Sequence, residues 1–332
     1  MITSRSMFLL AAAFSAGLAS ASESELLKQV RQQDGWVGYR VPMVAGHGNS
    51  CCYSGKGAGY SEGRGCNLDS GKGTTLSMQD GTDAAAGDLS VYWHVVNGKT
   101  DQVRTYSADC PVTSNKAVRW IDPVQSADSI RSIAQWVESG TSTRKGEDSA
   151  LVAIALHADA EATTTLIDFA ATGKAPKLRE ESIFWLGQTR GAPGADFVER
   201  VARTDLSDEI REHAVFSLSQ SDVKDAYDRV LGISKSDTSA DVRGKALFWM
   251  AQMGDPRAQA DIIAALDTET SEDVREEAIF ALSQLDEKVA THALIMVVRG
   301  NYPRSVKEKA LFWLGQTGTD EALAFIDEVL TR

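Results

Sequence analysis

The fold is decided by the stretch from Asp241 to Met250, which reads DVRGKALFWM, because its pattern recurs every 32 residues. Each copy carries a phenylalanine and, four positions later, a glutamine, in the segments FWLGQ, FSLSQ, FWMAQ, FALSQ and FWLGQ that begin at Phe184, Phe216, Phe248, Phe280 and Phe312. Six residues before each phenylalanine stands an aliphatic residue followed by a cation: Arg179, Arg211, Arg243, Arg275 or Lys307. Five copies at one spacing predict equal structural units that stack on one another and share a continuous core.

Each unit is predicted to consist of two helices. In the first helix Val242, Ala246 and Met250 fall at i, i+4 and i+8, which is the spacing of one helical face. The helix start is marked by N-cap serines or by proline, which needs no N–H partner there: Ser207, Ser239, Ser271, Pro176 and Pro303. The second helix keeps an aliphatic residue at one phase: Val198, Val230, Ile262, Leu294 and Ile326. A sixth, atypical copy precedes these and keeps Ala150, Leu151, Ile154, Leu166 and Phe169 in phase.

This repeated string resembles bacterial HEAT repeats, the short type also found in phycobilin lyases, and the resemblance covers residues 146–332. It implies an all-α solenoid whose second helices line the concave face. Most such arrays are binding scaffolds, and some are enzymes. The segments Trp36 to Pro42 and Ser107 to Pro111 are in turn similar to the N-terminal part of exported bacterial HEAT-repeat proteins.

The N-terminus is predicted to be an export signal. Arg5 precedes a short apolar run from Met7 to Leu18, and cleavage is expected after Ala21, which places the mature protein in the periplasm or outside the cell. An uncleaved membrane anchor is the alternative for this segment. No other apolar run is long enough to span a membrane.

Between the signal and the repeats, residues 22–125 are predicted to form a small glycine-rich β module, followed by a linking helix at 126–145 that begins with Ser126 as its N-cap. Strands are expected at 91–96 and 102–106 around an Asn97-Gly98 hairpin turn, and more weakly at 36–41 and 117–121. The predicted fold class is therefore α+β multidomain: a disulfide-stapled β module followed by an all-α HEAT-like solenoid.

All four cysteines lie in the β module, and an even number in an exported chain predicts two disulfides. A disulfide between the adjacent residues Cys51 and Cys52 would be strained. One of these two should therefore pair with Cys66 and the other with Cys110. A metal site using His47 with Cys51, Cys52 and Cys66 is the alternative, but it lacks the C-x-x-C spacing of structural zinc.

Charge separates the two halves of the chain. Residues 146–332 carry 20 basic and 33 acidic residues, a net charge of −13, whereas residues 22–145 are neutral. An acidic surface disfavours nucleic acid and anionic membranes and favours a basic protein or peptide partner. The expected contact sites are acids of the second helices together with three periodic tryptophans: Asp196, Glu199, Asp228, Asp261, Asp327, Glu328, Trp185, Trp249 and Trp313.

Purely structural roles are the alternative to partner binding for the repeated residues. The repeated cations are expected to form ion pairs between repeats with the acids beside them in the sequence, and the repeated glutamines to bond free carbonyls at helix ends. Tryptophans that alternate with Ser217 and Ala281 are more readily core residues that interdigitate than exposed anchors.

No catalytic motif, metal motif or cofactor motif is present, and the histidines do not follow the repeat. The sequence therefore predicts a non-enzymatic exported scaffold without a cofactor. The alternatives are a lyase-like or other enzyme built on HEAT repeats, and a role in envelope stability without a discrete partner.

Overall fold

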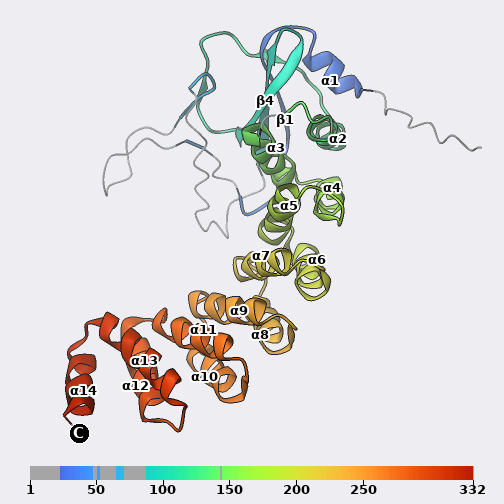
Figure 1. Cartoon of the computed structure of the whole chain (residues 1–332). Coiled ribbons are helices and arrows are strands. Elements are labelled where there is room, and N and C mark those ends of the chain that lie inside the picture. Colours follow the sequence, from blue (N-terminus) through green and yellow to red (C-terminus); the bar gives the residue numbers. More distant parts are fainter. Residues whose placement is uncertain (1–22, 48–50, 53–64, 71–86, 143, 332) are drawn as a thin grey trace, which may run out of the picture.

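The computed structural model describes residues 23–47, 51–52, 65–70, 87–142 and 144–331 (Figure 1), so the expected export signal at 1–21 lies outside the described residues. Within them the chain forms six strands and fourteen helices, with a small sheet at one end and a curved stack of helices that makes up the rest. No described helix has the length and apolar character needed to cross a membrane.

A four-stranded sheet forms the N-terminal region, with strand order β4-β3-β1-β6. Strands β1 (Gly35–Pro42), β3 (Asp88–Val96) and β4 (Lys99–Ser107) are antiparallel neighbours, and the two-residue β6 (Arg119–Trp120) pairs parallel to β1. The predicted hairpin turn is confirmed, because Asn97 and Gly98 both have positive φ, as a type I′ turn requires. The strand expected at 117–121 is shorter than predicted.

The two faces of this sheet pack against different partners, because side chains alternate along a strand. Val37, Tyr39 and Trp93 belong to a large core that also includes α1 (Glu25–Val30), α2 (Ser126–Glu138) and the solenoid. The opposite face carries a small separate core of Trp36, Leu68, Tyr92, Tyr106 and cysteines.

Two disulfides hold that second core. Cys51 is joined to Cys110 and Cys52 to Cys66, with Cα–Cα distances of 5.5 and 5.1 Å. They join the Cys51-Cys52 segment to β2 (Cys66–Asn67) and to Cys110, just before β5 (Val112–Thr113). Strands β2 and β5 form a two-stranded ladder, which the sequence did not predict, and the cysteines pack in the core on the outer face of the sheet.

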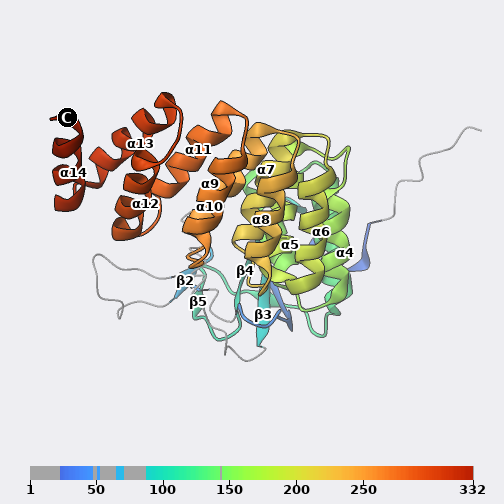
Figure 2. The same ribbon diagram turned by 90° about the horizontal axis from the view of Figure 1, so that it is seen from below.

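Six helix pairs follow, and each consists of a first and a second helix, as the 32-residue pattern predicts. The first helices are α3 (Arg144–Leu156), α5 (Pro176–Thr189), α7 (Asp208–Ser219), α9 (Ala240–Gln252), α11 (Glu272–Ser283) and α13 (Arg304–Thr317). The second helices are α4 (Ala160–Ala170), α6 (Gly191–Thr204), α8 (Ala226–Ser236), α10 (Ala258–Thr268), α12 (Glu287–Arg299) and α14 (Asp320–Leu330). Figure 2 shows the successive pairs side by side from α4 to α14.

The apolar positions predicted for the repeats are core residues. The members of the second-helix row are fully buried from Val198 to Leu294, and only Ile326 in α14 is half-buried. In the first, atypical copy the five in-phase residues from Ala150 to Phe169 are all buried.

Helix starts agree with the prediction in part. Ser207 caps α7, where its side chain accepts a hydrogen bond from the Ile210 N–H, whereas Ser239 and Ser271 occupy the N-cap position without that bond. The expectation for Ser126 is wrong: α2 begins at Ser126 itself, and Gln125 occupies its N-cap position without a side-chain bond.

The sheet is joined to the solenoid by backbone hydrogen bonds. Beyond β1, Met43 forms an antiparallel bridge with His157 at the end of α3. The Val44 N–H donates to the Leu156 carbonyl at 2.8 Å, and the Ala158 N–H donates to the Pro42 carbonyl at 3.0 Å. The first strand and the first solenoid helix are therefore parts of one unit.

Candidate interaction surface

The first helices line the inner side of the curve, and the second helices lie outside them (Figure 1). The helix pairs follow an arc in which α5, α7, α9, α11 and α13 are nearer its centre than α6, α8, α10 and α12. The expectation that the second helices line the concave face is therefore wrong, and side chains of the first helices form that face.

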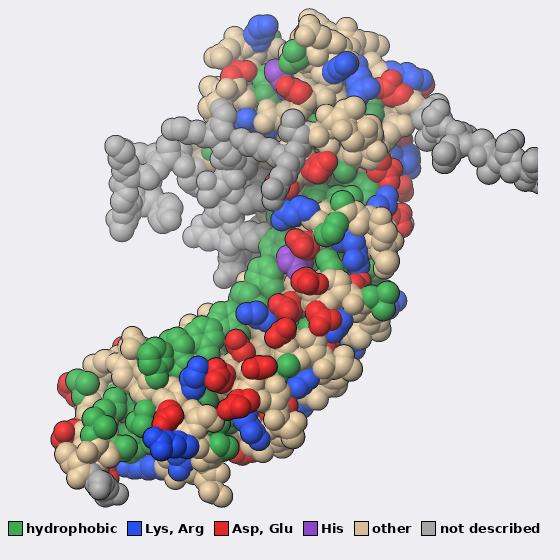
Figure 3. All heavy atoms as spheres, in the orientation of Figure 1, with side chains coloured by type: hydrophobic (Ala, Val, Ile, Leu, Met, Phe, Trp, Pro, Cys, Tyr) green, Lys and Arg blue, Asp and Glu red, His purple; other side chains and the backbone are tan. Residues whose placement is uncertain are grey.

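An uninterrupted row of aromatic rings runs along these first helices. We call this row the aromatic stripe; it consists of Phe184, Trp185, Phe216, Phe248, Trp249, Phe280, Phe312 and Trp313. Neighbouring ring centroids are 4.7 to 5.8 Å apart, within the range of favourable aromatic contacts. Figure 3 shows a band of hydrophobic side chains along the inner edge of the curve.

The alternation of large and small residues builds the stripe. Ser217 and Ala281 are buried where other repeats carry tryptophan. In the repeats with a small residue at this position, the phenylalanine contacts the tryptophan of the next repeat: Phe216 lies 4.7 Å from Trp249 and Phe280 lies 5.0 Å from Trp313. The predicted interdigitation of large and small residues is thus present between repeats.

Exposure increases along the stripe. Trp185 is only 6% exposed, so it is a core residue, whereas Trp249 and Trp313 are half-buried. Phe312 is 58% exposed, which is unusual for a phenylalanine. Of the three candidate tryptophans, Trp249 and Trp313 therefore lie at an accessible part of the concave face.

Acids accompany the stripe on the same helical face. Residues four and seven positions before each phenylalanine lie one and two turns away from it on that face. Acids occupy seven of these positions, here called the acid row: Glu180, Glu209, Glu212, Asp241, Asp273, Glu276 and Glu308.

Most of the acid row forms no ion pair with the described residues. Glu276 pairs with Lys309 at 2.8 Å and Glu308 with Arg304 at 2.7 Å, but the other five acids form no ion pair there. Burial raises the pKa of Glu212, and the neighbouring acids, among them Asp241, raise it further against the lowering effect of Lys245. The row is therefore a site of concentrated negative charge.

The glutamine row lies on the other side of the stripe, four residues after each phenylalanine. The Gln188 side chain donates to the carbonyl of Gln220 at 2.7 Å, which confirms for this residue a bond to a carbonyl at a helix end. Gln220 and Gln284 instead bond the serine before them. Gln252 and Gln316 are exposed and make no side-chain hydrogen bond with the described residues.

The acids expected to contact a partner lie on the outer second helices, where arginines of the same protein bind several of them. Arg229 of α8 pairs with Asp196 and Glu199 of α6, each at 2.8 Å. Arg257, beside α10, pairs with Asp228 of α8 at 2.7 Å. These bonds connect neighbouring repeats, so the acids have a structural role on the convex face.

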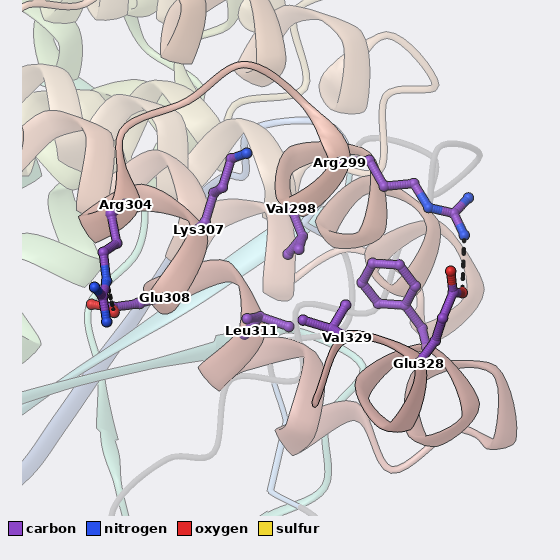
Figure 4. A pocket seen from close by; sticks show the side chains of 9 residues that line it. Val298, Arg299, Arg304, Lys307, Glu308, Leu311, Glu328 and Val329 are labelled. Atoms are coloured by element: carbon purple, nitrogen blue, oxygen red, sulfur yellow. Dashed lines mark hydrogen bonds and ion pairs between the residues drawn. The ribbon is translucent and has the colours of Figure 1, made fainter. Parts of the chain in front are cut away.

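The remaining members of that set are also mostly engaged. Asp261 accepts a hydrogen bond from the Tyr227 hydroxyl at 3.0 Å. Glu328 lies 3.7 Å from Arg299 at the rim of a cavity of about 350 Å³ between α12, α13 and α14 (Figure 4). Asp327 is exposed.

The five repeated cations are here called the cation ladder, and three of them form largely buried ion pairs. Arg211 forms a two-pronged pair with Asp237, with both N···O distances at 3.0 Å, and donates to the Asp205 carbonyl of the preceding repeat at 2.9 Å. Arg179 forms a single contact with Asp205, and Arg243 forms a two-pronged pair with Glu269 at 2.8 and 3.2 Å. The predicted ion pairs between repeats are therefore not found here: each pair joins the first helix of a repeat to an acid that follows the second helix of the same repeat.

Arg275 differs from the other three arginines. The position that carries the acid in their repeats is Asn301 in its own, and no described carboxylate lies within ion-pair distance of Arg275. Arg275 is therefore an arginine of the cation ladder that has no carboxylate partner among the described residues.

A serine–histidine pair is present, but it lies in the core. His157 and Tyr39 both contact the hydroxyl of Ser129, at 2.8 and 2.7 Å, and all three residues are fully buried. Burial lowers the pKa of His157 to about 4, and the Trp93 N–H donates to Tyr39. This cluster connects the sheet to α2 and α3, and a substrate has no access to it.

The chain is similar to two solved structures and to one family model. The complex of CpcE and CpcF of phycocyanin lyase from Nostoc sp. PCC7120 is 15% identical over 66% of this chain and 99% of that chain, with a TM-score of 0.31. Human deoxyhypusine hydroxylase in complex with glycerol is 16% identical over 60% of this chain and 77% of its own, with a TM-score of 0.27. No curated protein matches the chain. The family model of HEAT repeats matches residues 227–314.

Proposed function

We propose that the protein is an exported, non-enzymatic scaffold that binds a polypeptide partner along the concave face of its solenoid. The observation that carries this proposal is the aromatic stripe, which is continuous over five repeats and becomes accessible towards Phe312. Large aromatic side chains dominate the binding energy of protein interfaces, and a connected exposed apolar surface is typical of a binding site.

Two further features support the proposal. The export signal expected at residues 1–21 agrees with the two disulfides, because disulfides persist in oxidising compartments. The acid row beside the stripe adds a polar margin that favours a basic partner and would attract it electrostatically.

A site-specific crosslinking experiment tests this function. A photoreactive phenylalanine analogue is placed at Phe312 on the concave face or, as the control, at Leu323 in the second helix α14; these residues are 58% and 56% exposed. We expect a crosslink to one discrete protein in the native envelope from position 312 only. The partner identified should then bind the purified protein directly, and Phe312→Ala should weaken that binding. Crosslinking from position 323 alone, or from neither position, would refute the proposal.

A further inference from the structure

We propose that the cavity between α12, α13 and α14 binds a small carboxylate with an apolar tail, and that the carboxylate group lies on Lys307 (Figure 4). This site does not include the aromatic stripe, so the inference goes beyond the proposed function. Two observations carry it. Lys307 has none of the acids that pair with Arg211, its counterpart three repeats earlier, and apolar side chains line much of the cavity.

The cavity has a counterpart in an earlier part of the solenoid. A cavity of about 520 Å³ lies at the same place between α6, α7 and α8, where Arg203 and Arg211 line it. Arg299 and Lys307 hold the equivalent positions in the last repeats, because the pattern recurs every 32 residues. The two cavities are therefore copies of one feature of the solenoid and can be compared residue by residue.

Acids neutralise the ladder cation of the earlier cavity. Arg211 pairs there with Asp208 at 2.9 Å and with Asp237 at 3.0 Å. In the last repeat Arg304 stands in the place of Asp208, and the described residues include no counterpart of Asp237. One position of the repeat thus holds a cation with two carboxylates in the earlier cavity and a cation with neither of them in the later one.

The other charged residues of the later cavity pair with one another. Glu308 pairs with Arg304 at 2.7 Å, and Glu328 lies 3.7 Å from Arg299. Figure 4 shows these two pairs at opposite sides of the cavity. Lys307 forms no ion pair with the part of the chain that the structure describes, and the three cations and two acids of the lining give a net charge of +1. A single anionic group can therefore pair with Lys307 without displacing an acid.

The apolar part of the lining indicates what the rest of the ligand should be. Val298 and Phe325 are buried, and Leu311 and Val329 are half-buried. The volume of about 350 Å³ is within the range of small-molecule sites, about 300–1,000 Å³. An aliphatic tail gains free energy from each methylene that it buries against these side chains, whereas phosphate or sulfate would leave them uncovered. This chemistry favours a carboxylate on an aliphatic chain over an inorganic anion.

A series of ligands separates the two parts of the proposed recognition. The probes are hexanoate, octanoate and decanoate, and the controls are octanol and octylamine. Binding to the whole protein is followed by NMR shifts of the methyl groups of Val298, Leu311 and Val329. We expect octanoate to bind about tenfold more tightly than hexanoate, because each buried methylene contributes about fourfold. Octanoate should also bind about fivefold more tightly than octanol, because only the carboxylate pairs with Lys307, and octylamine should bind more weakly still.

Protein variants then locate the carboxylate. Lys307→Met should lower the affinity for octanoate about fivefold, to that for octanol, and leave octanol binding unchanged. The matched control is Lys288→Met, which removes an exposed lysine from the other end of α12 and should change neither affinity.

Arg304→Asp restores the acid that the earlier cavity has at Asp208, three positions before the ladder cation. It should weaken octanoate binding about fivefold, because Lys307 then has a carboxylate of its own. The new acid lies in the first turn of α13, where negative charge favours a helix, so helical circular dichroism should be retained.

Several results would overturn the inference. Equal binding of octanol and octanoate would mean that Lys307 takes no part, and equal binding of hexanoate and octanoate would mean that the tail is not buried. Displacement of octanoate by an equal concentration of phosphate would assign the site to an inorganic anion. Failure of every ligand to shift the three methyl resonances would also refute it, whereas the scaffold function is decided separately by crosslinking from position 312.

Discussion

Arg211→Met should destabilise the solenoid much more than Arg275→Met, although both substitutions remove an arginine from the same position of the repeat. At Arg211 the change removes the two-pronged pair with Asp237, a contact with Asp208 at 2.9 Å and the bond to the Asp205 carbonyl. Methionine keeps most of the aliphatic stem, so the packing of the side chain is largely preserved.

The expected loss in the free energy of unfolding follows from the Asp237 carboxylate, which the substitution leaves without its arginine. The side chain of Asp237 is only 5% exposed, and after the substitution its carboxylate would keep a single hydrogen bond, from the Ser239 N–H at 2.8 Å. Removing one partner of a buried pair costs about 3–5 kcal/mol. The remaining bond places the expected loss near the lower end, about 3 kcal/mol. Arg275 leaves no described carboxylate unpaired, so its replacement should cost about 0.5 kcal/mol or less.

Urea unfolding of both variants and the parent, followed by helical circular dichroism, measures the difference. Because repeat arrays can unfold locally, hydrogen exchange by mass spectrometry should also show faster exchange in α7 and α8 for Arg211→Met. A variant carrying Arg211→Met together with Asp237→Leu should recover part of the stability, since no unpaired charge remains. Equal losses for the two single variants would refute the assignment of the ladder as a set of buried ion pairs.

Three other perturbations have defined outcomes. Because burial holds the pKa of His157 near 4 against an ordinary 6.5, protonation is disfavoured in the folded state; stability should fall by up to about 3 kcal/mol as the pH drops from 6.5 to 4, and His157→Gln should flatten that part of the unfolding-against-pH curve. Gly187→Ala should destabilise the protein by about 1–2 kcal/mol in thermal melts, because its Cβ would come within 2.4 Å of the Ser217 hydroxyl, whereas Gly315→Ala has room and should be neutral or stabilising. Reduction of both disulfides should accelerate hydrogen exchange in residues 65–70 and 110–113 but leave the solenoid helices protected, because the cysteines belong to a core separate from that of the helices. Loss of the helical signal on reduction would contradict that separation.

The repeats could be predicted because their signals are local and periodic. The phase of Phe248 and its equivalents, the second-helix aliphatic row and the serine caps each repeat at one interval, and helix pairs follow directly from them. The hairpin around Asn97 was predictable for the same reason. The parallel pairing of β1 with β6 was not, because it joins segments more than 80 residues apart and leaves no periodic trace.

The candidate site was predicted less well, and for physical reasons. Which helix layer lies inside depends on the relative bulk of the two layers and on how each repeat rotates against the next, and neither is visible in a single helix pattern. The ladder acids carried a signal that was missed: Asp205, Asp237 and Glu269 recur 32 residues apart. They lie 26 residues after their arginines, so a search among sequence neighbours of the cations overlooked them.

The backbone bridge between Met43 and His157 has a mechanical consequence. That bridge consists of two backbone hydrogen bonds where β1 meets α3, so a pulling force would have to break both of them at once. Successive repeats, in contrast, are connected by side chains such as those of Arg211 and Gln188. Under tension the helix pairs should therefore separate one after another, while the sheet remains attached to the first pair.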